Sequence, residues 1–418
     1  MNLIIKSATI LDASSKHHRT TKDILIENGI ITQIATSIEN SNNYETISLE
    51  NLHVSQGWFD SSISLGEPGF EERETIENGL KTAAKSGFTA VAVNPNANPI
   101  ADTKADIAFL KSNAFGNAVD LYPIGALTTK SKSVDLAELF DMKNAGAVAF
   151  GDYQKAIENP NLLKIALLYA DNFDGLVLSF PQENKVVGKG IVNEGPNSTR
   201  LGLKGIPSLA EELHIARDLF LLEYTKGKLH IPTISTAKSV QLIREAKAKG
   251  LNVSCSVAIH NLMMTDDELE TFDTNYKVLP PLRTEKDRKA LIEALFDGTI
   301  DMVTSDHNPI DVEHKKVEFD NAMFGTIGLE SAFGALQTIC NTDKTIELLT
   351  AGKERFGIAI SNITEGQKAN LTLFNPEGTY TFTKKHIHST SQNSAFYGKE
   401  LKGTVYGIIH NHQKIDSL

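Results

Sequence analysis

Cysteine, basic charge and long apolar runs are all scarce in this sequence. Its two cysteines, Cys255 and Cys340, exclude a disulfide framework and a four-cysteine metal site. The 41 Lys and Arg residues are outnumbered by 52 Asp and Glu residues, so the net charge of −11 argues against nucleic acid or an anionic membrane as the main partner. No apolar stretch approaches the ~20 residues of a membrane span, and none near the first residue suits a signal peptide. We therefore expect a cytoplasmic protein with no nucleic-acid or membrane partner.

What the sequence does contain is the composition of an ordinary globular protein. Hydrophobic residues make up 41% of the 418 residues and charged residues 22%, so extensive disorder is excluded. At about 150 residues per domain, this length accommodates two or three domains, or one large barrel with an appended domain.

Short apolar runs alternate with amphipathic helical stretches through the middle of the chain. The expected strands are 57–65, 88–94, 118–124, 145–150, 176–180, 229–234, 253–257 and 302–305. Repeated strand–helix units predict a parallel sheet with helical crossovers, and eight of them over roughly 250 residues match a closed (β/α)8 barrel. An open, doubly wound sheet is the alternative, although no glycine-rich dinucleotide motif follows any of these strands.

Both ends of the chain are rich in short strands. Asn28-Gly29 between two apolar runs indicates a β-hairpin, and strand patterns return from about Gly366 to the last residues. We predict an α/β protein in which residues 1–52 and 366–418 form one small β-sandwich domain beside a barrel of residues 53–365.

Six sequence motifs at or near the strand ends give more specific information about the family. They are GWFDSSISLGEPG at 57–69, ETIENGLKTAAKSGFTAVAVNPNANP at 74–99, EGPNSTRLGLKGIPSLAEE at 194–212, LHIPTISTAKSV at 229–240, VLPPLRTEKDRKALIEALFDGTIDMVTSDHNP at 278–309 and FGTIGLESAF at 324–333. In this order they resemble the dihydroorotase family of the amidohydrolase superfamily. The resemblance implies a site at the C-terminal mouth of the barrel, where histidines hold zinc, the zinc makes a hydroxide and an aspartate moves the proton. It also implies dihydroorotate, in pyrimidine biosynthesis, as substrate.

The sequence departs from that family at the chemical positions. Where the family pattern has histidines, a substrate-binding arginine and an asparagine, this chain has Ser62, Ser64, Phe180, Thr233, Ile310, Gly66 and Leu279. The resemblance leaves Asp306 as a vestigial proton shuttle and Asn96 as a vestigial substrate-binding residue. His307 is retained, and Asp152 stands near the family's bridging aspartate.

The substitutions remove the groups that zinc needs. Ser and Thr hydroxyls are neutral at pH 7, whereas zinc takes about four nitrogen or sulfur ligands. His230 lies three residues before Thr233, so strand alternation is expected to point it into the helix layer. Asp152 and Asp306 could hold a hard cation weakly. A bound metal lowers the pKa of water, and losing it raises the free energy needed to ionise that water by at most roughly 12 kcal/mol. A lone general base accelerates a reaction only about 10²–10⁴-fold. We therefore expect no metal and no cofactor.

These observations favour a catalytically inactive dihydroorotase homologue that acts as a structural or regulatory partner. The resemblance suggests aspartate carbamoyltransferase as that partner, and a homodimer as the oligomeric state. The alternatives are an active dihydroorotase or related cyclic amidohydrolase with a non-standard metal site, and a sensor that binds a pyrimidine precursor without reacting. The helix expected at 208–226 shows no clear exposed apolar stripe, so the pattern itself does not determine the oligomer.

Overall fold

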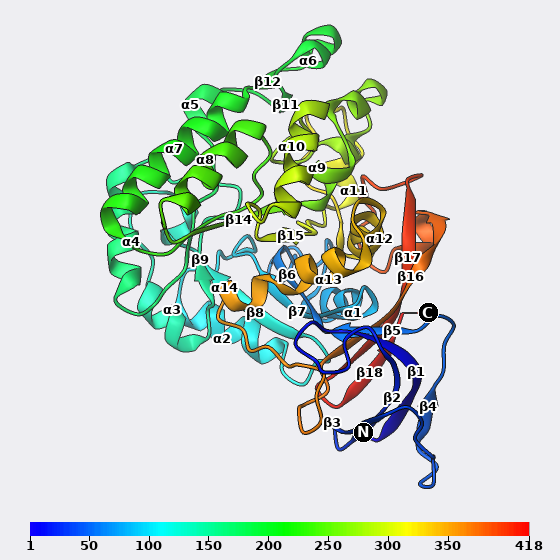
Figure 1. Ribbon diagram of the computed structural model, residues 1–418. Coiled ribbons are helices and arrows are strands. Elements are labelled where there is room, and N and C mark those ends of the chain that lie inside the picture. Colours follow the sequence, from blue (N-terminus) through cyan, green and yellow to red (C-terminus); the bar gives the residue numbers. More distant parts are fainter. Residues whose placement is uncertain (418) are drawn as a thin grey trace.

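The computed structural model describes residues 1–417, and its centre is a parallel eight-stranded barrel (Figure 1). The order of its strands follows the chain. They are β6 (Trp58–Ile63), β7 (Phe88–Val93), β8 (Asp120–Gly125), β9 (Ala149–Phe150), β10 (Val177–Leu178), β13 (Leu229–Ile231), β14 (Val253–Ala258) and β15 (Met302–Thr304). Each strand lies within or next to one of the expected apolar runs.

The first and last strands of the barrel meet, which distinguishes a closed barrel from an open sheet. Ile63 forms a parallel bridge with His307, directly beyond β15. Asp60 of β6 also accepts hydrogen bonds from the Thr304 hydroxyl and from the Ser305 N–H, the latter at 2.9 Å. Burial raises the pKa of this carboxyl, while these donors oppose the increase. The predicted barrel is confirmed, and the doubly wound alternative is wrong.

Helices surround the barrel and begin at polar capping residues. Thr75, Thr103, Thr236 and Thr284 each accept a hydrogen bond from a backbone N–H of the helix that follows. The helices are α1 (Ile76–Lys85), α2 (Lys104–Asn113), α3 (Leu139–Ala145), α4 (Pro160–Asp171), α5 (Asn184–Val187), α6 (Pro196–Leu201), α7 (Ser208–Thr225), α8 (Ala237–Ala248), α9 (Ile259–Met263), α10 (Glu285–Phe296), α11 (Val312–Lys315), α12 (Leu329–Ile339), α13 (Thr342–Thr350) and α14 (Gly352–Arg355). Within residues 1–417, no helix is long and apolar enough to cross a membrane.

Strands from the two ends of the chain form a second sheet. It runs β18-β17-β16-β5-β1-β2-β3, and β4 pairs with β1. The strands are β1 (Leu3–Leu11), β2 (Thr21–Glu27), β3 (Ile30–Ala35), β4 (Glu45–Ile47), β5 (His53–Gln56), β16 (Leu371–Thr381), β17 (Glu400–His410) and β18 (Gln413–Asp416). A separate two-stranded ribbon pairs β11 (Val192–Asn193) with β12 (Gly205–Ile206).

The junction of the two ends lies between β5 and β16, which pair in an antiparallel manner. β5 begins at residue 53, one residue beyond the predicted end of the N-terminal segment. The expected hairpin joins β2 to β3, and Asn28 and Gly29 both adopt positive φ, as a tight two-residue turn requires. The fold is therefore an α/β barrel with a small β-domain built from both chain ends, as predicted.

The chain's single tryptophan joins the two parts. Trp58, at the start of the first barrel strand, is fully buried and stacks on Phe333 of α12 with ring centroids 4.8 Å apart. It also packs against Phe374 of β16 at 5.6 Å, and its indole N–H donates to the Ser55 hydroxyl. The barrel, α12 and part of β16 and β17 therefore share a core around Trp58, while the other strands of the β-domain pack around a second core of their own.

Candidate functional site

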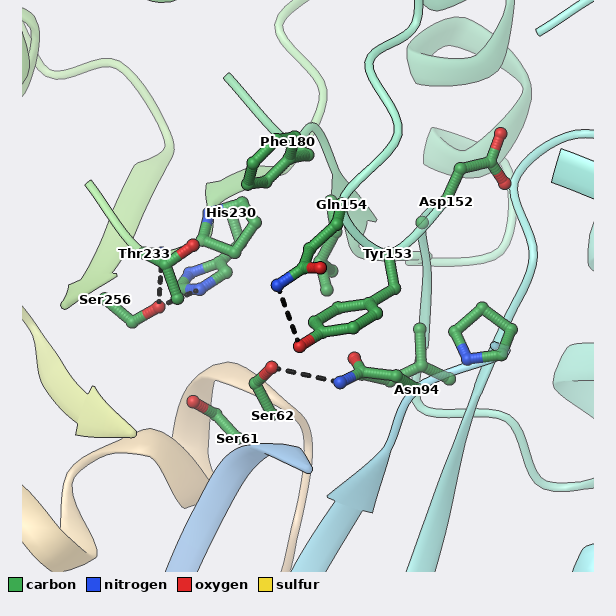
Figure 2. Close-up of a pocket in the computed structure, with 15 residues that line it drawn as sticks. Ser61, Ser62, Asn94, Asp152, Tyr153, Gln154, Phe180, His230, Thr233 and Ser256 are labelled. Carbon is green, nitrogen blue, oxygen red and sulfur yellow. Dashed lines mark hydrogen bonds between the residues drawn. The ribbon is translucent and has the colours of Figure 1, made fainter. Parts of the chain in front are cut away.

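A small cavity lies among the carboxyl ends of the barrel strands, where barrel proteins place their active sites (Figure 2). Residues of β6, β8, β10, β13 and β14, and of the segments after β7, β9, β10 and β13, line it. The polar ones, with one phenylalanine, are Ser61, Ser62, Asn94, Asp152, Tyr153, Gln154, Phe180, His230, Thr233 and Ser256. The free space among them is about 20 Å³, enough for a single water molecule. The protein's own side chains therefore nearly fill the barrel mouth.

Asp306 is the centre of a hydrogen-bond network at this mouth. Its Oδ1 accepts hydrogen bonds from the Ser62 hydroxyl and from the Tyr153 hydroxyl, both at 3.2 Å. The Asn94 amide donates in turn to Ser62 Oγ at 3.1 Å and to Ser64 Oγ at 3.4 Å. Burial raises the pKa of Asp306 to about 7, although its two donors lower it. Near neutral pH this carboxyl is therefore only partly ionised.

Tyr153 and Gln154 close the mouth from the segment that follows β9. Gln154 Nε2 donates to Tyr153 Oη at 3.1 Å and to the Leu279 carbonyl at 2.8 Å, which holds the phenol across the cavity (Figure 2). Burial and the neighbouring Asp306 carboxylate raise the pKa of Tyr153 well above its ordinary value. Tyr153 thus remains a neutral hydrogen-bond donor. No periodicity or motif in the sequence distinguishes these two residues from other loop residues.

His230 lies in the cavity lining, so the predicted orientation toward the helix layer is wrong. β13 ends at Ile231, and Thr233 adopts a left-handed φ of 47°, which breaks strand alternation between His230 and Thr233. The two imidazole nitrogens lie 2.9 Å from Ser254 Oγ and 3.2 Å from Ser256 Oγ. Burial lowers the pKa of His230 to about 3, so the ring is neutral.

The other residues singled out from the sequence occupy different surroundings. Thr233 and Phe180 line the cavity with Ser62, and Ser64 is buried beside Asn94. Asp152 also borders the cavity, but its carboxylate accepts from the Thr128 hydroxyl and N–H and points away from Tyr153 (Figure 2). Asn96 is not among the lining residues; Asn94, two positions earlier, is. The functional roles assigned to Asp306 and Asn96 stay predictions.

The donors at the mouth do not fit a zinc ion. Ser62 and Thr233 offer neutral hydroxyls, and both nitrogens of His230 already have serine partners. His260 has two buried nitrogens without partners in the described part of the chain, but it is not among the residues that line the cavity. Across residues 1–417, no three His, Cys, Asp or Glu side chains lie in an arrangement that could hold a metal. No catalytic step through zinc follows from these residues.

Comparisons with known proteins place the chain in a family. A family model described as dihydro-orotase-like matches residues 53–239. The dihydroorotase of Pelotomaculum thermopropionicum is 40% identical over 416 residues, which cover 98% of this chain and 97% of that protein. The dihydroorotase of Acetivibrio thermocellus is 38% identical over 417 residues, covering 98% and 97%.

Solved structures show the same fold at lower identity. The L-hydantoinase (dihydropyrimidinase) from Arthrobacter aurescens superimposes with a TM-score of 0.86 at 20% identity, over 99% of this chain and 96% of that one. A D-hydantoinase structure gives a TM-score of 0.84 at 22% identity, covering 100% and 96%. The curated relatives match at higher identity along nearly the whole chain, so this protein belongs to the dihydroorotase family of the amidohydrolase superfamily.

Proposed function

We propose that this protein is a catalytically inactive member of the dihydroorotase family that serves pyrimidine biosynthesis in the cytoplasm as a structural or regulatory partner. The observation that carries the proposal is the filled barrel mouth. Tyr153, Gln154 and Phe180 are among the side chains that line this cavity at the carboxyl ends of the strands, and its free space is about 20 Å³. That space holds a water molecule and excludes a six-membered ring.

The chemistry of the remaining groups supports the same conclusion. Hydrolysis of a cyclic amide needs an activated nucleophile, and the mouth offers the Ser62 hydroxyl hydrogen-bonded to Asp306. Within residues 1–417 the Ser62 hydroxyl is hydrogen-bonded to Asp306 and Asn94 and to no imidazole that could take up its proton. His230, the histidine of the cavity lining, is hydrogen-bonded to Ser254 and Ser256 instead. Asp306 acting alone as a general base would accelerate the reaction about 10²–10⁴-fold. That is far below the acceleration that enzymes of this kind require.

The proposed partner is aspartate carbamoyltransferase, on the basis of the family resemblance. The 418-residue chain keeps an intact barrel, a joined β-domain and one shared core around Trp58, all of which a structural role needs.

The test is an activity assay with metal content measured on the same sample. Dihydroorotate hydrolysis and the reverse ring closure are followed with purified, chelator-treated and zinc-loaded protein, while the Pelotomaculum thermopropionicum dihydroorotase serves as the positive control. We expect no turnover above background in any of the three states. Turnover that increases with bound zinc would overturn the proposal of inactivity. If the two proteins do not co-purify from cells that express both, aspartate carbamoyltransferase is refuted as the partner.

An active enzyme with a non-standard metal site is the alternative. His260 is the observation in its favour, because a buried imidazole without partners in the described residues is a candidate ligand. Stoichiometric metal in freshly purified protein, lost in the variant His260→Ala, would support it.

A further inference from the structure

A larger cavity lies outside the barrel, where the barrel meets the β-domain. It is bounded by α1, α12, β16, β17 and the segment 385–388, and the four named elements lie together in Figure 1. Its lining residues, all within 1–417, are different from those of the cavity at the barrel mouth. Its free space is about 440 Å³, within the range of about 300–1,000 Å³ that small-molecule sites occupy. This cavity is therefore large enough for a metabolite, whereas the barrel mouth is not.

Basic side chains surround this cavity. Lys85 lines it from the end of α1, and Lys385, His386 and His388 line it from the segment between β16 and β17. Burial and the positive charge of Lys85 both lower the pKa of His388, so these groups are close enough to repel one another. Four basic side chains in one place are a local exception in a chain of net charge −11. Their mutual repulsion would be relieved by an anion bound among them.

The acidic side chain of the lining is already bonded by the protein's own donors. Among the described lining residues, Glu330 alone is acidic. Its Oε1 accepts hydrogen bonds from the His388 N–H at 3.2 Å and from the Ser389 N–H and hydroxyl at 3.0 and 2.6 Å. On the other side, Asn78 of α1 donates to the His388 carbonyl at 3.2 Å. Two helices therefore hold in place the segment that carries the basic side chains.

Aromatic rings form another wall of the cavity. Tyr380 of β16 and Phe333 of α12 line it, and the rings of Tyr380 and His386 lie 4.9 Å apart. Burial raises the pKa of Tyr380 to about 12, so the phenol stays a neutral donor. The Thr383 N–H donates to Nδ1 of His386 at 3.0 Å, which leaves the proton of the neutral imidazole on Nε2. A ligand with a flat ring can therefore pack against these side chains and accept hydrogen bonds from them.

We propose that this cavity binds a nucleoside monophosphate, with the phosphate beside Lys85 and Lys385 and the base against Tyr380. A phosphate monoester carries about two negative charges near pH 7 and has three acceptor oxygens, which ammonium groups bind through charge-assisted hydrogen bonds. Every nucleobase has a flat face that stacks on an aromatic side chain. The site does not involve the barrel mouth, so the proposal is independent of whether the protein is catalytically inactive.

The first experiment is calorimetric titration of the full chain. The probes are uridine monophosphate and adenosine monophosphate, with uridine and inorganic phosphate as the separate halves of the ligand. We expect both nucleotides to bind at one site per chain, at least about tenfold more tightly than uridine or phosphate, because each half fills only part of the cavity. No binding of either nucleotide at millimolar concentration would overturn the proposal. Equal affinity for nucleotide and inorganic phosphate would overturn it too, since the base would then contribute nothing.

The second experiment compares two neighbouring lysines. Lys385 lines this cavity, whereas Lys384 lines a different depression, and both side chains are exposed. Lys385→Glu and Lys384→Glu change the net charge equally, so a general electrostatic effect would be the same in both. We expect Lys385→Glu to weaken nucleotide binding at least about tenfold and Lys384→Glu to change it less than about twofold. Equal weakening by the two variants would contradict the assignment.

A third variant tests the aromatic wall. Tyr380→Leu should weaken binding of both nucleotides about tenfold, because it removes the stacking surface, and should leave binding of inorganic phosphate unchanged. Unchanged nucleotide affinity in this variant would overturn the placement of the base. Folding of every variant is verified by the fluorescence of the buried Trp58.

Discussion

The stability of this protein should depend on pH through Asp306. Its pKa is about 7 in the folded protein against an ordinary value of 3.8, because burial disfavours the carboxylate. The folded state therefore binds this proton more tightly than the unfolded chain does. The resulting stabilisation is fully present below about pH 4 and is lost as the pH rises through about 7. At about 1.36 kcal/mol per unit the whole effect is at most about 4 kcal/mol, of which about 2–3 kcal/mol falls between pH 5 and pH 8.

The variant Asp306→Asn isolates this contribution. Its amide oxygen can accept the hydrogen bonds that Oδ1 of Asp306 accepts from Ser62 and Tyr153, but it does not ionise. Urea unfolding followed by the fluorescence of Trp58, at pH 5 and at pH 8, gives the free energy of unfolding of each protein. We expect the wild type to lose about 2–3 kcal/mol more than Asp306→Asn between these pH values. Asp135→Asn, at an exposed carboxylate, is the control and should follow the wild type. Equal losses in wild type and Asp306→Asn would refute the assignment.

Three further outcomes follow from single buried side chains. Tyr153→Ala should lower the free energy of unfolding by about 3 kcal/mol, because it empties the barrel mouth; a loss below about 1 kcal/mol would mean that the mouth closes again. Trp58 should emit at short wavelength and resist acrylamide quenching until the protein unfolds, since it is fully buried; easy quenching of the native protein would contradict the shared core. Burial lowers the pKa of Lys353, which bonds the Gly57 carbonyl, to about 8, so stability should rise as the pH increases from about 8 to 10.5. Lys353→Met should abolish that rise, as urea unfolding at both pH values would reveal.

The local pattern of apolar runs and turn residues in the sequence was sufficient to predict the architecture. β7, at Phe88–Val93, is an apolar run between a helix and a polar turn, and the hairpin at Asn28-Gly29 follows from turn chemistry alone. Such features depend on residues close in sequence, so one chain is enough to predict them. The joining of the two ends was the economical interpretation of two short, strand-rich segments, and the pairing of β5 with β16 confirms it.

The tertiary structure decided which groups meet at the barrel mouth. His230 was expected among the helices, but the left-handed Thr233 brings it to the cavity. Tyr153 and Gln154 lie in a loop after β9, where side-chain direction depends on contacts such as the one to Leu279, more than a hundred residues away. Periodicity carries no information about such directions, since a loop has no repeating geometry.

The surface of α7 shows the same division most plainly. Its sequence mixes apolar residues with charged ones such as Glu212, Arg217 and Glu223, so the pattern alone predicts a helix with leucines to bury and does not say which side is buried. The packing of α4 and α8 beside it and of the barrel beneath it covers Ile215 and Leu222 and leaves Phe220 and Tyr224 in solvent. The sequence by itself determined that apolar surface exists there. Only the arrangement of neighbouring elements decided which part of it remains exposed, because burial is a property of packed surfaces and not of one segment.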